Sequence, residues 1–169
     1  MFTVSVKQKN PRYSFDLKTT LKALTEKKVV AGFPKGKLNT PHYQYKNGRG
    51  KAQNKNPPSI IDVAIQNNFG IGVPRREFMS VAAKKWQKMF VESYDQIQNA
   101  LEQGHIDADK FLKTMGLAGA NYISETIRDW TIPPNSPETI ARKGANNPLV
   151  DTGDMKNAPQ YEIRKADSK

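Results

Sequence analysis

The side chains most often used for catalysis or metal binding are scarce in this sequence. The chain has no cysteine and two histidines, His42 and His105, which lie far apart. The absence of cysteine excludes thiolate metal sites, disulfides and cysteine nucleophiles. The histidines lack the close partners that a metal-binding motif needs. The sequence therefore predicts no metal-binding residue.

Glycines and carboxylates give equally little support for catalysis. Gly70-Ile71-Gly72 lacks the third glycine of a dinucleotide loop, which would fall at Arg75, and follows a helical pattern instead of a strand. No G-x-x-x-x-G-K-[ST] or G-x-S-x-G motif is present. Asp151, Asp154 and Glu162 are close in sequence, but helix capping and strand surface explain Asp151 and Glu162 more simply. We expect a non-enzymatic protein with no catalytic residue and no cofactor.

Basic residues are concentrated in one part of a chain with a net charge of +11. From Lys27 to Ile61 there are eight lysines and arginines and no acidic residue. The candidate contacts are Lys35, Lys37, Lys46, Arg49, Lys51 and Lys55. These residues are expected either to form a solvated loop or to contact DNA phosphates or an acidic protein partner.

The same segment interrupts the regular apolar pattern of the chain. Residues 34–58 are rich in Lys, Asn, Gly and Pro, and Tyr43 and Tyr45 alternate before Asn47-Gly48, a pair suited to a hairpin turn. We expect either a protruding β-hairpin or a flexible loop that becomes ordered on assembly.

Apolar spacing predicts the remaining elements. In order they are a strand at 2–6, a helix at 14–28, a strand at 29–33, a helix at 60–69, a long helix at 77–103, a second long helix at 107–130, a short helix at 137–143 and a strand at 161–164. This order predicts an α/β (α+β) fold in which a small, mostly antiparallel sheet packs against two long helices. Residues 1–169 are expected to form a single domain, with an extended arm at 131–150.

Two glycines inside the second long helix predict a close contact. Gly116 and Gly119 each weaken a helix by about 1 kcal/mol relative to alanine, so a packing reason is expected. Two other segments would form turns. Ser136-Pro137 has the pattern of a helix start, and Gly144 is expected to close that helix. Asp151 with Thr152 is expected to cap a short turn through Met155.

The ends of the helix at 60–69 are also marked. Ser59 and Asp62 have the spacing of a capping box, although the box prefers Glu or Gln at the later position. Gly70 is expected to stop the helix.

No secretory or membrane segment is predicted. Met1 to Val6 alternates polar and apolar residues, unlike a signal peptide. No stretch approaches the roughly 18 to 20 apolar residues of a membrane span. We expect synthesis in the cytoplasm and no membrane partner.

Three segments together resemble a known family. They are IDVAIQNNFGIGVPRREF (Ile61–Phe78), PPNSPETIARKGANNPLVDTGDM (Pro133–Met155) and QYEIRK (Gln160–Lys165). Their order and spacing are similar to the neck and tail-completion proteins of tailed bacteriophages, the head–tail joining group that includes the morphogenesis proteins of Mu-like phages. The family's T-I-x-R-K-G and P-L-[VI]-D-T-G-x-[LM] patterns are met in full.

The chain departs from the family pattern at two places. Arg76-Glu77-Phe78 stands where a proline usually precedes the phenylalanine. Asn157-Ala158-Pro159 replaces an asparagine-serine-isoleucine sequence, and Pro159 is expected to shorten the last helix.

The resemblance implies a structural virion protein at the head–tail junction, present in the host cytoplasm during assembly. It implies a ring, on the order of six or twelve copies, in contact with phage connector, tail tube or tail sheath proteins. The candidate assembly interface comprises Arg75, Arg76, Ile140, Arg142, Lys143, Leu149, Asp151 and Thr152. The alternative function is a non-specific nucleic-acid-binding protein that uses the basic loop, with Tyr43 and Tyr45 as a stacking platform.

Overall fold

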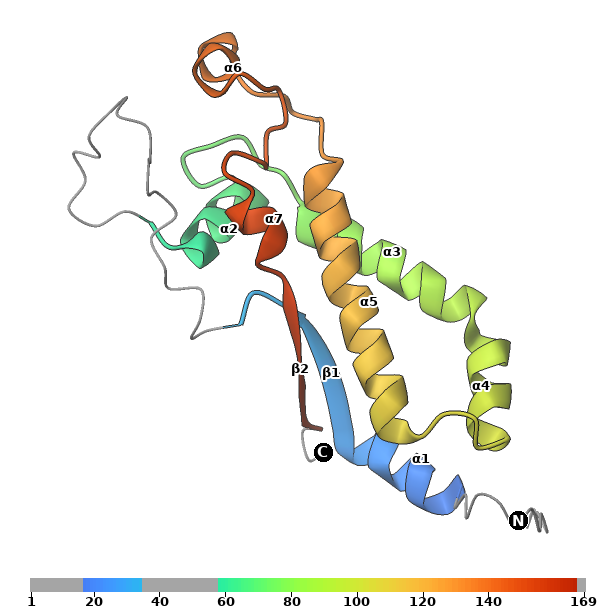
Figure 1. Ribbon diagram of the computed structural model, residues 1–169. Helices are drawn as coiled ribbons and strands as arrows, with labels where there is room; N and C mark the ends of the chain where they lie inside the picture. Colours follow the sequence, from blue (N-terminus) through green and yellow to red (C-terminus); the bar gives the residue numbers. More distant parts are fainter. Residues whose placement is uncertain (1–16, 35–57, 167–169) are drawn as a thin grey trace.

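The computed structural model describes residues 17–34 and 58–166 (Figure 1). Two predictions fall outside these residues, namely the strand at 2–6 and the hairpin or loop at 34–58, apart from its first and last residues. The same holds for the candidate contacts Lys35, Lys37, Lys46, Arg49, Lys51 and Lys55.

Helices dominate the described residues. The elements are α1 (Leu17–Glu26), β1 (Lys27–Gly32), α2 (Ile60–Phe69), α3 (Phe78–Glu92), α4 (Tyr94–Glu102), α5 (Ala108–Arg128), α6 (Pro137–Lys143), α7 (Asp154–Asn157) and β2 (Gln160–Lys165). The predicted mixed fold with a small antiparallel sheet is confirmed. None of the described helices has the length and apolar character needed to cross a membrane.

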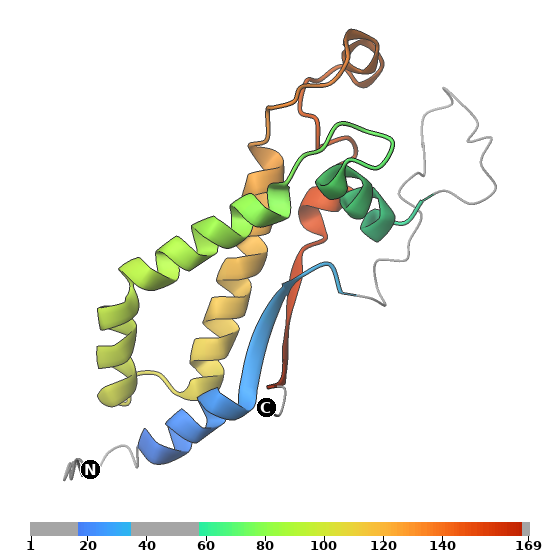
Figure 2. The same cartoon turned by 180° about the vertical axis from the view of Figure 1, so that it is seen from behind.

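The sheet pairs the two ends of the described chain. β1 and β2 are antiparallel, with Val29 opposite Ile163 and Ala31 opposite Tyr161. Helix α5 packs along one face of this sheet, and α3 packs on α5 (Figures 1 and 2). Helix α5 is therefore the central support that connects the sheet to the rest of the fold.

The two glycines of α5 let the sheet approach the helix closely, as predicted. A Cβ atom at Gly116 would overlap the ring of Tyr161 and lie 2.9 Å from Cγ2 of Val29. A Cβ atom at Gly119 would lie 2.8 Å from Cβ of Ala31. Both distances are too short for carbon atoms that are not bonded, so these positions exclude a side chain.

The hydrophobic core lies at the C-terminal end of α5. Phe78 and Ile127 are its fully buried large side chains, and Phe78 meets the ring of Phe33 edge-on with centroids 6.2 Å apart. The other buried members of this cluster are Ile60, Ala64, Ala82, Ile123, Leu149, Met155 and Ala158. The core therefore joins α2, α3, α5 and α7.

The predicted long helix at 77–103 is wrong in one respect, because it is broken at Ser93. This residue has φ −97° and ψ 2°, outside helical geometry, and separates α3 from α4. Helix α4 turns away from the line of α3 (Figure 1). The spacing of apolar residues continues across the break. The rings of Phe90 and Tyr94, one on each side of it, pack edge-on with their centroids 6.3 Å apart. The sequence pattern therefore concealed the turn.

Two other boundaries also differ from the prediction. Lys27 and Lys28 belong to β1 instead of ending the preceding helix, because they pair with Lys165 and Arg164 of β2. Helix α5 ends at Arg128, before Trp130. Tertiary pairing in the sheet overrides the local preference for a basic helix end.

The N-terminus of α2 is closed by a capping box. The Ser59 hydroxyl accepts a hydrogen bond from the Asp62 backbone N–H at 3.2 Å, and Asp62 Oδ2 accepts one from the Ser59 N–H at 2.9 Å. The Ser59 hydroxyl also donates to Asp62 Oδ2 at 2.7 Å, and this hydrogen bond, together with that from the Ser59 N–H, lowers the pKa of the Asp62 carboxyl from its ordinary value. The predicted cap at Ser59 is confirmed, with aspartate in the place usually held by glutamate or glutamine.

Replacing Ser59 with alanine is expected to reduce the free energy of unfolding by about 1 kcal/mol, because an N–H group of α2 loses its acceptor. Urea denaturation followed by circular dichroism measures this loss. Ser80→Ala on the exposed side of α3 is the matched control and is expected to change stability little. Equal losses from the two variants would contradict the capping argument.

Candidate functional site

An arm leaves the C-terminal end of α5 and returns to α7. It spans residues 129–153 and carries α6, which projects away from the rest of the fold in both views (Figures 1 and 2). Helix α6 has no buried residue. Ser136 Oγ accepts a hydrogen bond from the Thr139 N–H at 3.2 Å, Pro137 opens the helix, and Gly144 closes it with φ 71°. These are the start and end expected from the sequence.

Asn147 holds the base of the arm together. Its Oδ1 accepts hydrogen bonds from the backbone N–H groups of Leu149 and Val150, each at 2.9 Å. Its carbonyl oxygen accepts from Lys143 Nζ at 2.9 Å and from Asn135 Nδ2 at 3.2 Å. The role of Asn147 was not predicted, although an asparagine before Pro148 is a recognised turn signal.

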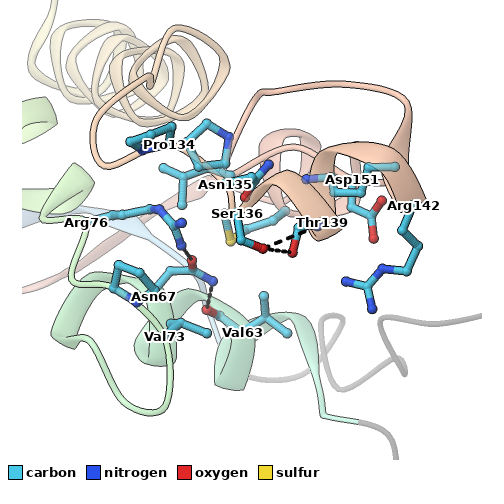
Figure 3. A pocket seen from close by; sticks show the side chains of 15 residues that line it. Val63, Asn67, Val73, Arg76, Pro134, Asn135, Ser136, Thr139, Arg142 and Asp151 are labelled. Carbon is cyan, nitrogen blue, oxygen red and sulfur yellow. Dashed lines mark hydrogen bonds between the residues drawn. The ribbon is translucent and has the colours of Figure 1, made fainter.

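A pocket of about 290 Å³ separates the arm from α2 (Figure 3). Basic side chains come from both of its sides: Arg76 from the segment before α3, and Arg142 with Lys143 from α6. Asp151 is the acidic residue among the described lining residues. The pocket is therefore electropositive, with three cationic side chains and one carboxylate.

Arg76 is the most buried of these cations, with 5% of its surface exposed. Its Nη1 donates to Asn67 Oδ1 at 2.8 Å, and its Nε donates to the Pro133 carbonyl at 3.3 Å. Within the described residues it forms no ion pair. Burial lowers the pKa of its guanidinium from the ordinary value. Arg76 thus links α2 to the arm while its charge has no carboxylate partner in the described part of the chain.

The pKa of Lys143 is lowered by its surroundings in the same pocket. Burial lowers the pKa of its ammonium group, and the nearby charges of Arg76 and Arg142 lower it further. The carboxylate of Asp151 acts in the opposite direction. The neighbouring cations therefore disfavour the charged form of Lys143, and a bound anion would act in the opposite direction.

The structure brings most of the candidate interface residues together. Arg76, Arg142, Lys143, Leu149 and Asp151 all line the pocket. Leu149 differs from the others, because it is also a buried member of the hydrophobic core. Its role in packing was not predicted from the sequence.

Three candidate interface residues lie outside the pocket lining. Arg75 is exposed and pairs with Glu77 at 3.0 Å. Ile140 is half-buried on α6, and Thr152 donates a hydrogen bond to Asp154 at 2.6 Å. Of the two residues expected to cap this turn, Asp151 is wrong, because Gly153 holds the N-cap position of α7. Thr152 Oγ1 does accept a hydrogen bond from the Asp154 N–H, at 3.4 Å.

The described residues contain no group of three or more histidine, cysteine, aspartate or glutamate side chains placed to hold a metal ion. The chemistry that the pocket does offer is anion recognition, since guanidinium groups bind carboxylates and phosphates through paired hydrogen bonds. No family model, curated protein or solved structure matches the chain.

Proposed function

We propose that this protein is a structural component of the head–tail junction of a tailed bacteriophage, assembling there as a ring with connector and tail proteins. The projecting arm is the observation that carries the proposal. A helix such as α6, which buries none of its residues in its own subunit, gains little stability from that subunit. Such extensions are typical of proteins whose neighbours complete their packing.

Exposed apolar residues near the arm support the same function. Phe69, Ile71 and Val73 lie at the end of α2 and in the loop after it, and all three are exposed. Ile132 at the start of the arm is exposed as well. Apolar side chains grouped on the surface are characteristic of protein–protein contacts.

The overall charge fits a position beside packaged DNA or an acidic protein partner. The chain has a net charge of +11, which favours association with anionic surfaces. If the partner is DNA, the contacts are with its phosphates, and such contacts depend on charge and not on base sequence. The basic loop and the pocket cations would both contribute.

Mass spectrometry of purified particles tests the proposal directly. The expected result is that particles of the phage encoding this chain contain it at several copies per particle. Its absence from mature particles would contradict the proposal. Binding of DNA by the free protein together with that absence would favour the alternative function.

Replacing Ile71 with aspartate is expected to impair assembly without unfolding the protein. Ile71 is 57% exposed, so the free energy of unfolding should change by no more than about 0.5 kcal/mol. The titre of infectious particles should fall, because a charge would enter an apolar contact. Complementation of a null mutant measures the titre.

Leu117→Asp on α5 provides a control of matched exposure, at 56%. It lies away from the arm and is expected to leave the titre higher than Ile71→Asp does. An unchanged titre for Ile71→Asp would remove the loop after α2 from the assembly surface.

A further inference from the structure

One segment of this basic chain is acidic. The segment from Glu92 to Asp109 contains five carboxylates and no lysine or arginine, in a chain whose net charge is +11. Half of this segment forms α4, which lies at the end of the fold opposite the arm in both views (Figures 1 and 2). The electropositive pocket lies beside the arm at the other end. The acidic segment and the electropositive pocket therefore lie at opposite ends of the fold.

Helix α4 exposes an acidic face. It has no buried residue, and among the helices and strands it makes its main contacts with α3. Asp95 and Glu102 are seven residues apart, which places them on the same side of a helix with 3.6 residues per turn. Both carboxylates are exposed. This face therefore presents two negative charges to the solvent.

These two carboxylates are not neutralised within the described residues. Glu92 pairs with Lys88 at 3.6 Å, and Asp109 pairs with Lys27 at 2.8 Å. Asp95 and Glu102 form no such pair with any described residue; Glu102 accepts a hydrogen bond from Gln98 at 2.8 Å. Two negative charges thus remain available to a partner.

The pocket, in turn, has positive charges that lack an ion-pair partner among the described residues. Arg76 is buried without an ion pair in the described part of the chain, and a buried charge without a partner is costly. Arg142 and Lys143 add positive charge at the same place, while Val63 and Met155 give it an apolar wall. A carboxylate on a short aliphatic stem matches both features, since the stem contacts the wall and the oxygens meet the guanidinium groups.

We propose that the acidic face of α4, centred on Asp95 and Glu102, docks into the pocket of Arg76, Arg142 and Lys143 on a second copy of the chain. The proposal rests on the ring assembly put forward above and supplies its contact. The two surfaces are different, so the interface is heterologous: each copy offers a pocket to one neighbour and α4 to the other. Such contacts continue from copy to copy until the ring closes.

Two variants separate the two surfaces. Arg142→Glu changes an exposed residue of α6 and keeps α4 intact. The double variant Asp95→Asn, Glu102→Gln neutralises α4 with little change of shape and keeps the pocket intact. Each variant alone is expected to raise the dissociation constant of self-association roughly tenfold or more. Analytical ultracentrifugation measures it, and circular dichroism verifies the fold.

Mixing the two variants gives the sharpest result. The α4 of the Arg142→Glu protein still fits the pocket of the double variant. The α4 of the double variant no longer binds the pocket of the Arg142→Glu protein, and neither variant binds a copy of itself. A head-to-tail interface therefore predicts 1:1 dimers in the mixture and nothing larger. Lys84→Glu on α3 and Glu125→Gln on α5 are exposed controls and are expected to assemble like the unmodified chain.

Several outcomes would overturn this interface. One is unmodified protein that stays monomeric at every concentration; another is an Arg142→Glu protein that self-associates normally. A third is loss of binding to a short DNA duplex in Arg142→Glu with self-association unchanged, which would assign the pocket to phosphates. Particles that contain the protein but tolerate both variants would reject this contact while leaving the proposed function standing.

Discussion

Replacing Phe78 with alanine is expected to lower the free energy of unfolding by about 3–5 kcal/mol. The side chain is 0% exposed and packs edge-on against Phe33. It is the first residue of α3 and lies in the cluster that joins this helix to α2, α5 and α7. Its loss removes buried apolar surface and leaves a cavity. Because a whole domain is stable by only about 5–15 kcal/mol, the variant would be close to unfolding.

Urea denaturation followed by circular dichroism measures the effect. Phe78→Leu keeps most of the volume and should cost less than about 1.5 kcal/mol. Phe90→Ala, on the same helix but 37% exposed, is the positional control and should cost clearly less than Phe78→Ala. Similar losses at the two phenylalanines would contradict the placement of the core at the end of α5.

Replacing Gly116 with alanine is expected to destabilise the protein, although alanine is the better helix former. The gain in helix propensity is about 1 kcal/mol. Against it stands the overlap of the new Cβ with the base of the Tyr161 ring and with Val29. The base of an aromatic ring moves only with its strand, so β2 would have to shift. Overpacking of this kind costs about 1–3 kcal/mol, and we expect it to exceed the propensity gain.

Thermal unfolding of this variant measures the balance of the two effects. Leu117→Ala, one residue further along α5 and exposed, has no such overlap and should change stability little. A double variant that pairs Gly116→Ala with Tyr161→Ala should recover part of the loss, because the ring is the main obstacle. A more stable Gly116→Ala protein would show that α5 and the sheet are not in close contact.

The sequence predicted those elements whose boundaries are marked by local chemistry. Ser59 and Ser136 are caps, Gly70 and Gly144 end helices at positive φ, and each was identified from its residue type. The break at Ser93 was missed because the spacing of apolar residues continues across it. That spacing reports which side of a helix is apolar, and it says nothing of a change in the direction of the helix axis.

The pocket could be predicted only in part. The residues Arg76 and Arg142 were selected from two separate segments, but their meeting depends on the path of the arm. That path is fixed by Asn147 and by the hydrogen bond from Arg76 to the Pro133 carbonyl. Burial of Arg76 without an ion pair among the described residues is a tertiary property with no local signal. The acidic face of α4 was not predicted either, because the sequence does not show that α4 lies at the end of the fold away from the pocket.

The most direct measurement of the central claim is an electron cryomicroscopy map of the head–tail junction. We expect a closed ring of this chain between connector and tail, with the arm of each copy contacting a neighbouring subunit. Lys, Arg and carboxylate side chains of α6 and α4 should meet at the boundary between copies. A junction fully accounted for by other proteins, with no density for this fold, would contradict the claim.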